Sequence, residues 1–310
     1  MRKTTPAFLL FFINIFSLLL ASAQAHGEKR IPHLLSSSTE GEGQNKSARH
    51  ASNPEPPTMR IVSLAPVVTE TLFALGIGDH VVGVTRFCDR PAAASVIEKV
   101  GGYIDPQIEK ILSLKPTLVI AMPSMGQREK LIILKERNIP VAVVFGDTIQ
   151  EILESFTFIG GLVHREEAAN HLIARTRHRL DKVRHQAKIS QHRPRTLVVV
   201  SVQPLVIAGP GTFAHEAIEI AGGTPAYTKG TQQWPTLSLE SLLSLNIDAI
   251  IAAEGPAQAE LLRQQLAAHG SNRTQVVAAQ THLFMRPGPT LTDDIETLFS
   301  LLHNNHRQTP

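Results

Sequence analysis

The stretch Ile108-Glu-Lys-Ile-Leu-Ser-Leu-Lys-Pro-Thr-Leu-Val-Ile-Ala121 predicts a short helix, a loop and then a buried strand. It aligns without gaps on Leu239-Glu-Ser-Leu-Leu-Ser-Leu-Asn-Ile-Asp-Ala-Ile-Ile-Ala252, at a constant offset of 131 residues with six of the fourteen positions identical. A duplication would produce this match, and so would convergence on a common helix-loop-strand unit. Both explanations predict two similar α/β lobes in one chain.

Further strands and helices alternate on both sides of these stretches. Such alternation is typical of a mostly parallel sheet covered by helices on both faces. The additional strands are expected at 60–65, 81–84, 141–145 and 196–202, and the additional helices at 66–76, 128–137, 215–221 and 257–269.

A long helix is predicted between the lobes, because residues 165–188 contain no Gly or Pro and are rich in good helix formers. About 24 residues at 1.5 Å per residue make a strut of roughly 36 Å. His164, His171, His178 and His185 recur along it at intervals of seven. Such histidines rise about 10.5 Å from one to the next, too far to share a metal ion, so the stripe is interpreted as a solvated or partly packed face.

The N-terminus has the pattern of a signal peptide over residues 1–25. Arg2 and Lys3 precede an apolar stretch over 7–20, and Ala23-Gln24-Ala25 matches the small-x-small cleavage pattern. The apolar stretch is shorter than the roughly 20 residues of a membrane span. No cysteine stands at the cleavage point, which argues against a lipid anchor. An exported protein held in the periplasm is therefore expected.

Composition limits the remaining possibilities. The chain has 310 residues, of which 43% are hydrophobic and 18% charged, as in a soluble globular protein of about two domains. A net charge of +3 without any Lys/Arg run argues against nucleic-acid binding. A single cysteine excludes an intrachain disulfide, a thiolate zinc site and an iron–sulfur cluster.

Residues 26–58 are rich in Ser, Gly and Pro and cannot bury enough surface to fold, so they are expected to form a flexible linker. The expected domain order is therefore a signal peptide at 1–25, a flexible linker at 26–58, an N-terminal α/β lobe at 59–163, a connecting helix at 164–190 and a C-terminal α/β lobe at 191–310.

Ligands of parallel α/β sheets bind beyond the carboxyl ends of the strands. The loops expected there include 86–91, 101–103, 122–126 and 209–211, with the loop that contains Tyr227 and Trp234. Both tyrosines and the only tryptophan thus fall in loops. Flat amphipathic rings suit a large planar ligand, although each ring could instead cover its own loop. The sequence lacks the nucleophile elbow, the His-Glu-x-x-His motif and the P-loop, so we expect a binding protein rather than an enzyme.

Two carboxylates, Glu70 and Glu240, lie near the expected starts of helices. A carboxylate near a helix N-terminus gains about 0.3 to 1 kcal/mol from the helix dipole, which explains their position without a function. One exposed carboxylate on each lobe would also make a two-point docking site. The residues alone do not choose between the two explanations.

Several motifs carry a resemblance to a known family. They are Arg60-Ile-Val-Ser-Leu-Ala-Pro-Val-Val-Thr-Glu-Thr-Leu-Phe-Ala-Leu-Gly76, Val81-Val-Gly-Val-Thr-Arg-Phe-Cys-Asp-Arg-Pro91, Val100-Gly-Gly-Tyr103, Leu114-Lys-Pro-Thr-Leu-Val-Ile-Ala121 and Trp234-Pro-Thr-Leu-Ser-Leu-Glu240. In this order they resemble the periplasmic cobalamin-binding proteins of ATP-binding-cassette (ABC) importers, part of a helical-backbone group that also binds ferric siderophores and haem. The resemblance covers about residues 59–304.

The resemblance implies two Rossmann-like lobes joined by one long backbone helix, with no catalysis, no cofactor and no metal ligand of its own. The protein would capture a corrinoid between its lobes and hand it to a membrane permease driven by ATPase subunits. Glu70 and Glu240 match the family's docking carboxylates. Phe87, Tyr103 and Trp234 match positions where rings face the corrin.

Departures from the family pattern keep a second ligand class open. Phe87 replaces a common tyrosine, Met122 stands where an aromatic residue can occur beside the ligand, and Arg90 replaces a tyrosine before Pro91. Fewer rings and additional positive charge would suit a ferric siderophore or haem. Arg286 matches a recurrent motif to which no role is assigned.

Overall fold

The computed structural model describes residues 32–35, 59–124, 127–190, 192–271, 273–279, 284 and 286–304. The predicted signal peptide and most of the predicted linker lie outside these residues. The described residues fall into two compact units. The N-terminal unit comprises Ile31–Phe145 and Phe158–Arg165, and the C-terminal unit comprises Gly146–Thr157 and Glu166–Pro310.

The N-terminal unit is built on a five-stranded sheet in the order β1-β5-β4-β2-β3. Four of its strands are parallel, so their carboxyl ends meet at one edge, and they are almost completely buried. These four are β2 (Ile61–Ser63), β3 (Val81–Val84), β4 (Leu118–Ala121) and β5 (Val141–Val143).

The remaining strand, β1 (His33–Leu35), lies within the segment predicted to be a flexible linker, and here the structure differs from the expectation. It pairs antiparallel with β5, with His33 opposite Val143 and Leu35 opposite Val141. The exposed edge of a sheet offers unpaired N–H and C=O groups, and a short apolar segment that pairs with them covers that edge.

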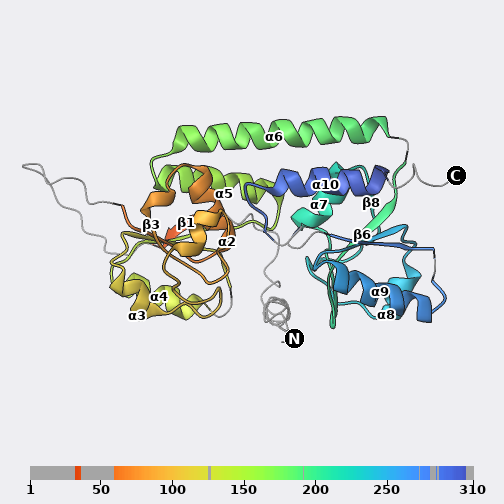
Figure 1. The fold of residues 1–310 in the computed structure, drawn as a ribbon, viewed down its shortest axis with the longest axis horizontal. Helices are drawn as coiled ribbons and strands as arrows, with labels where there is room; N and C mark the ends of the chain where they lie inside the picture. The colour runs from red at the N-terminus through yellow and green to blue at the C-terminus, as the bar shows by residue number, and fades with distance from the viewer. Residues whose placement is uncertain are drawn as a thin grey trace, which may run out of the picture. The chain divides into compact units, whose positions relative to one another are not determined.

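Helices cover both faces of this sheet (Figure 1). The side chains of α3 and α4 pack with residues of β2, β4 and β5 in one hydrophobic core, while α2 covers the other face. The helices are α2 (Pro66–Ala74), α3 (Ile108–Ser113) and α4 (Arg128–Glu136), with short 3₁₀ turns at Gly78–His80 and Ala92–Val96.

The C-terminal unit contains a second sheet in the order β10-β9-β6-β7, with β8 also paired to β6. The strands β10, β9, β6 and β8 are parallel, and β7 returns antiparallel beside β6. Their bounds are Arg195–Val202 for β6, Leu205–Ile207 for β7, Thr224–Pro225 for β8, Ala249–Ala252 for β9 and Gln275–Ala278 for β10.

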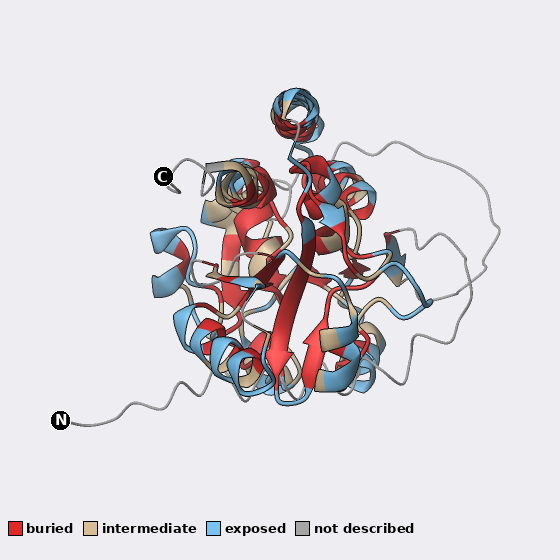
Figure 2. Ribbon diagram, turned by 90° about the vertical axis from the view of Figure 1, so that its right-hand side faces the viewer, coloured by how far each residue is buried: buried red, intermediate tan, exposed pale blue. Residues whose placement is uncertain are grey.

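Helices again form a layer on each side of this sheet (Figures 1 and 2). Leu242 of α8 and Leu262 of α9 belong to one core with β6 and β9, whereas α7, α10 and α6 lie on the opposite side. Their bounds are Glu166–Ile189 for α6, Phe213–Ile220 for α7, Leu239–Ser244 for α8, Pro256–Ala268 for α9 and Leu291–Asn304 for α10.

The repeated sequence stretches fold alike. In the first, α3 and β4 occupy 108–113 and 118–121, and in the second, α8 and β9 occupy 239–244 and 249–252, so the offset of 131 residues is preserved in every element. Each of the two strands also lies between two parallel neighbours of its sheet. The prediction of two similar α/β lobes is confirmed.

The long helix predicted over 165–188 is α6, which is a single helix over Glu166–Ile189. Its buried residues, which include Leu180, Val183 and Ala187, form one stripe along the helix, and Figure 2 shows this helix almost end-on with its exposed side outward. Gly222, at φ 82°, allows the turn after Ile220 to approach this helix closely, since a Cβ at Gly222 would lie 2.9 Å from the Cβ of Ala187.

Another helix, α5 (Ile149–Leu162), precedes α6 and was not predicted from the sequence. The boundary between the two units falls within it, between Thr157 and Phe158. It buries Ile152, Phe156 and Ile159, so tertiary packing stabilises a segment whose β-branched and aromatic residues are poor helix formers.

Candidate functional site

At the carboxyl edge of the N-terminal sheet, two loops are tied together beside Phe87. The loop after β3 bonds to the turn that follows Val100, because the Arg86 N–H donates to the Gly101 carbonyl at 2.8 Å. The Arg86 side chain then pairs with Asp105 at 2.8 Å, and its guanidinium carbon lies 5.2 Å from the centre of the Phe87 ring. The Arg86 guanidinium thus lies within cation–π distance of the half-buried Phe87 ring.

The turn at 101–106 requires a glycine at its start. Gly101 has φ 102°, in the region that L side chains rarely adopt. A Cβ there would lie 2.5 Å from the backbone oxygen of Asp105 and 2.9 Å from the backbone nitrogen of Gln107. Since backbone atoms cannot move aside cheaply, Gly101 fixes the course of the chain into Tyr103.

Tyr103 connects this turn to the loop after β4. Its hydroxyl donates to the Pro123 carbonyl at 2.8 Å, and the side-chain amide of the buried Gln127 donates to the Tyr103 carbonyl. Met122, half-buried, precedes Pro123 directly. The structure therefore brings Phe87, Tyr103 and Met122 onto loops at one edge of one sheet, while their contact with a ligand stays a prediction.

Trp234 belongs to the C-terminal unit, on an extended segment that runs antiparallel to β7. The Ile207 N–H donates to the Pro235 carbonyl at 3.1 Å, and the Gly209 N–H donates to the Gln233 carbonyl at 2.7 Å. The Gln233 side chain adds a bond to the Gly211 carbonyl at 2.7 Å. Backbone bonds on both sides of the half-buried Trp234 thus hold this loop segment against β7.

The two predicted docking carboxylates differ in their surroundings. Glu240 is exposed in the first turn of α8, where the N-cap Ser238 accepts a hydrogen bond from the Ser241 N–H at 3.0 Å. Glu70 is only 6% exposed and lies beyond the first turn of α2, which differs from the expectation of an exposed side chain on each lobe. Because the dipole acts within the first turn, it accounts for Glu240 but not for Glu70.

Three polar residues near the carboxyl edge of the second sheet were not among the predicted site residues. Glu254 follows β9 and is half-buried, and Gln258 and Arg286 are each 6% exposed. Burial raises the pKa of Glu254 to about 7. A signal was present in the sequence, because the 131-residue offset places Glu254 opposite Pro123, beside the predicted ligand residue Met122.

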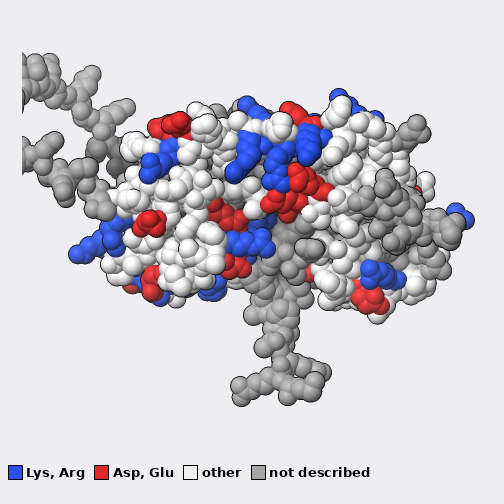
Figure 3. Space-filling view, turned by 45° about the horizontal axis from the view of Figure 1, so that its top comes forward, with Lys and Arg blue, Asp and Glu red and all other residues white. Residues whose placement is uncertain are grey.

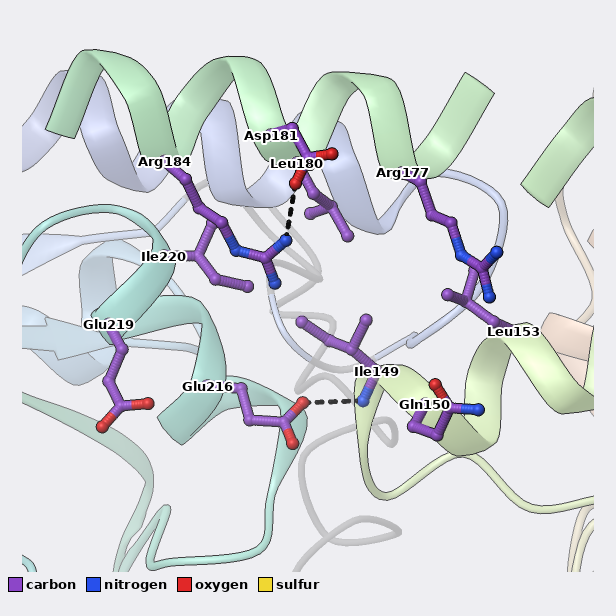
Figure 4. A pocket seen from close by; sticks show the side chains of 10 residues that line it. All are labelled: Ile149, Gln150, Leu153, Arg177, Leu180, Asp181, Arg184, Glu216, Glu219 and Ile220. Carbon is purple, nitrogen blue, oxygen red and sulfur yellow. Dashed lines mark hydrogen bonds and ion pairs between the residues drawn. The ribbon is translucent and has the colours of Figure 1, made fainter. Parts of the chain in front are cut away.

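A separate cavity of about 620 Å³ lies within the C-terminal unit, between α5, α6 and α7 (Figure 4). Arg184 pairs with Asp181 at 2.8 Å, and the carboxylate of Glu216 accepts a hydrogen bond from the Ile149 N–H at 2.8 Å. Burial raises the pKa of the Glu216 carboxyl. Glu216 thus fastens the first residue of α5 to α7.

Surface charge and the histidine stripe add no further site. His164, His171, His178 and His185 are all exposed, as predicted for a solvated face. Among the described residues, no three His, Cys, Asp or Glu side chains gather so that they could hold a metal ion. The face shown in Figure 3 mixes basic and acidic side chains. Every helix in the described part of the chain is too short or too polar to cross a membrane.

Comparison with known proteins matches residues 61–280 to the family described as periplasmic binding protein. Over 254 residues the chain is 28% identical to the vitamin B12-binding protein of Vibrio cholerae, which covers 81% of this chain and 92% of that protein. It is 30% identical over 248 residues to YvrC of Bacillus subtilis, an uncharacterized ABC transporter substrate-binding lipoprotein, covering 77% and 78% of the two chains.

Solved structures show the same fold. The periplasmic vitamin B12 binding protein BtuF of Vibrio cholerae has a TM-score of 0.67 at 27% identity, covering 81% of this chain and 99% of that chain. The periplasmic heme-binding protein RhuT of Roseiflexus sp. RS-1, in its apo form, has a TM-score of 0.71 at 23% identity, covering 80% and 98%.

These likenesses confirm the family resemblance that the sequence motifs predict. They confirm the predicted helical-backbone fold with two α/β lobes as well. They also confirm the expectation of a binding protein rather than an enzyme, since the matched family is one of transport-related binding proteins. With a match that spans well over half of its length, the chain belongs to the periplasmic binding protein family.

Proposed function

We propose that this protein is the substrate-binding component of an ABC importer, which captures cobalamin or a related corrinoid and delivers it to a membrane permease. The observation that carries the choice of ligand is the likeness to the vitamin B12-binding protein of Vibrio cholerae over 81% of this chain. The role in an ABC importer is supported by the relative named as an ABC transporter substrate-binding lipoprotein.

The loops at the sheet edges support this ligand class. Phe87, Tyr103 and Met122 lie on loops held together by the Arg86–Asp105 pair and by the bond from Tyr103 to Pro123. Trp234 adds a ring on the other unit. Amphipathic rings and a thioether on a pre-formed edge suit a large, flat, partly apolar ligand, because little side-chain freedom is lost on binding.

A ferric siderophore or haem is the second candidate ligand. Two observations favour it, namely the fold shared with the heme-binding protein RhuT and the arginines at 86 and 90 in the loop after β3. Arg86 already pairs with Asp105 at 2.8 Å, which leaves less of its charge for an anionic ligand. The corrinoid is therefore the ligand that we place first.

Equilibrium dialysis with cyanocobalamin, haemin and a ferric catecholate siderophore, read by visible absorbance, tests the choice of ligand. Retention of cyanocobalamin at one equivalent per chain, with weaker retention of the other two, is the expected result. Preferential retention of haemin or of the siderophore would replace the corrinoid by that ligand and leave the transport role in place.

Docking to the permease is proposed for Glu70 and Glu240, one on each unit. Glu240 is exposed, whereas Glu70 is buried, so their tests differ. Glu240→Arg is expected to abolish uptake of labelled cobalamin by cells while the purified protein binds ligand as before. For Glu70 the variant to test in the same uptake assay is the conservative Glu70→Gln, because an arginine in a buried position would disturb the fold.

Glu260→Arg, an exposed position on α9, is the matched control and should leave uptake unchanged. Normal uptake by the Glu240→Arg protein, or loss of ligand binding by the purified variant, would rule out the docking role of Glu240.

The location and domain order proposed for the chain are a signal peptide at 1–25, a linker at 26–58, and a mature protein in the periplasm without a lipid anchor. The absence of a cysteine at the cleavage point supports this proposal, in contrast to the relative that is named a lipoprotein. Mass spectrometry of protein from the periplasmic fraction should find a chain that begins at His26. A longer or lipid-modified N-terminus would contradict it.

A further inference from the structure

Glu254 lies at the carboxyl end of β9. In the sequence repeat this position corresponds to the loop after β4, which contains the predicted ligand residue Met122. Glu254 is the second residue after β9, and in the repeat it corresponds to Pro123, the second residue after β4. The N–H groups of Ala253 and Ala279 donate to the Val199 and Ala252 carbonyls at 2.9 Å, so the sheet pairing continues up to this point. The residue therefore lies where open parallel sheets place ligand-binding side chains.

The backbone fixes Glu254 in place. Its N–H donates to the side-chain oxygen of Gln258 at 2.9 Å, and the next residue, Gly255, turns the chain at φ 101° into α9. Gln258 is buried, and its amide nitrogen has no hydrogen-bond acceptor among the described residues. A rigid strand end thus carries a carboxylate and, beside it, an amide group whose donor capacity is unused.

The carboxylate of Glu254 has no compensating partner in the part of the chain that the structure describes. It is half-buried, it accepts no hydrogen bond from a described residue and it forms no ion pair with one. Burial alone accounts for its raised pKa, without a contribution from Glu260 and Arg263 of α9 or from Arg286 beyond β10. A carboxylate that loses water without gaining a donor costs stability, so the position is difficult to explain by folding alone.

We propose that Glu254 is a specificity-determining residue whose carboxylate accepts hydrogen bonds from uncharged N–H groups of the ligand and disfavours anionic chelates. This inference rests on the proposed function, since the peripheral primary amides of a corrinoid supply such donors. Haem propionates and ferric catecholate siderophores would instead bring negative charge toward this carboxylate.

The test is a calorimetric titration of the full mature chain with cyanocobalamin at pH 8, 7 and 5.5, for the wild type, Glu254→Gln and Glu254→Ala. The ionised carboxylate is the form that binds, so wild-type affinity should fall by up to about tenfold per pH unit below 7. Glu254→Ala should bind about 10- to 100-fold more weakly than the wild type at pH 8, because a bond to a charged acceptor is lost.

The conservative variant separates ligand contact from a structural role. Glu254→Gln retains an acceptor oxygen, so it should lose less affinity than Glu254→Ala and should bind with almost no dependence on pH. In the same variant the affinity for haemin should rise relative to the wild type. Glu260→Gln, in the exposed part of α9, is the control and should keep the wild-type affinity and pH profile.

The outcomes distinguish this inference from the proposed function. A wild-type protein that binds no corrinoid at any pH overturns the proposed function and, with it, the amide contact. A wild-type protein that binds cyanocobalamin while both Glu254 variants bind it equally well, with the same pH profile, overturns only the role of Glu254.

Discussion

At the scale of single residues, Glu254 is a side chain whose proposed role in ligand binding comes at a cost to the stability of the fold. Most buried polar groups of a folded protein have hydrogen-bond partners, and the exceptions call for an explanation. Glu254 comes close to such an exception, since its half-buried carboxylate has no hydrogen-bond or ion-pair partner among the described residues and burial raises its pKa to about 7. Residues of this kind are expected at functional sites, where the native structure is not at its most stable.

The raised pKa predicts how stability depends on pH. The folded protein binds the Glu254 proton more tightly than the unfolded chain, so the contribution of this group is fully present below about pH 4.5 and is lost as the pH rises through 7. Glu254→Gln should therefore raise the melting temperature at pH 8 and change it little at pH 5, as measured by circular dichroism. An equal shift at both pH values would show that the carboxylate is not the cause.

Gly101 provides a second test at this scale. Gly101→Ala introduces a Cβ 2.5 Å from the backbone oxygen of Asp105 at a positive φ, so it should lower the free energy of unfolding by about 1 to 3 kcal/mol. It should also weaken ligand binding, because Tyr103 lies two residues further on. Chemical denaturation and a ligand titration measure the two effects.

Gly161 is the matched control in the same unit. It lies in α5 with nothing within 4 Å of an added Cβ, so Gly161→Ala should be neutral or should stabilise the protein by up to about 1 kcal/mol. Equal stability of the Gly101→Ala protein and the wild type would contradict the strain assigned to the turn.

Among the elements, those with a clear local pattern could be predicted from the sequence and those that depend on packing could not. The repeat at 108–121 and 239–252 located a helix and a strand in each unit, because apolar residues at helical spacing are followed by a continuous apolar run. The helix α5 was not predicted although its buried residues Ile149, Phe156 and Ile159 follow helical spacing. Its β-branched and aromatic residues and the pair Gly160-Gly161 lower its intrinsic helix propensity, so packing is needed to stabilise it.

The same limit applies to β1 and to the candidate site. The segment around β1 resembles a linker in composition, and only the open edge of β5 makes three of its residues a strand. Tyr103 and Trp234 are conspicuous as aromatic residues in predicted loops, whereas Phe87 was named from the family resemblance. Glu254 was not named although the 131-residue offset places it opposite Pro123, because its burial and its lack of a partner among the described residues are not evident from the sequence.

The contact between α5 and α7 gives a test at the scale of elements. The carboxylate of Glu216 accepts from the N–H of Ile149, the first residue of α5, as a capping side chain would. Glu216→Ala should therefore lower the free energy of unfolding by about 1 kcal/mol. Chemical denaturation monitored by circular dichroism measures the change.

Glu216→Gln and Glu219→Ala are the controls for this contact. Glu216→Gln keeps an acceptor for the α5 N–H and should lose less stability than Glu216→Ala. Glu219 is exposed one turn along α7, and Glu219→Ala should stay within about 0.5 kcal/mol of the wild type. If Glu216→Ala and Glu219→Ala had the same small effect, the capping role would be excluded.

At the scale of the whole molecule, the structure consists of two units built alike, each with a mostly parallel sheet and with candidate ligand residues on segments beside that sheet. Phe87, Tyr103 and Met122 lie on one unit, and Trp234 and Glu254 lie on the other. Glu70 and Glu240 are likewise divided between the two units. Each unit thus carries candidate residues for ligand binding and for docking.

The most direct test of the central claim is a titration of residues 26–310 with cyanocobalamin that follows calorimetric heat and the fluorescence of Trp234, the only tryptophan of the chain. We predict saturable binding of one corrinoid per chain at micromolar or tighter affinity, with quenching of Trp234 and much weaker binding by Trp234→Ala. The absence of heat and of quenching, in protein shown to be folded, would contradict the claim that this protein captures a corrinoid.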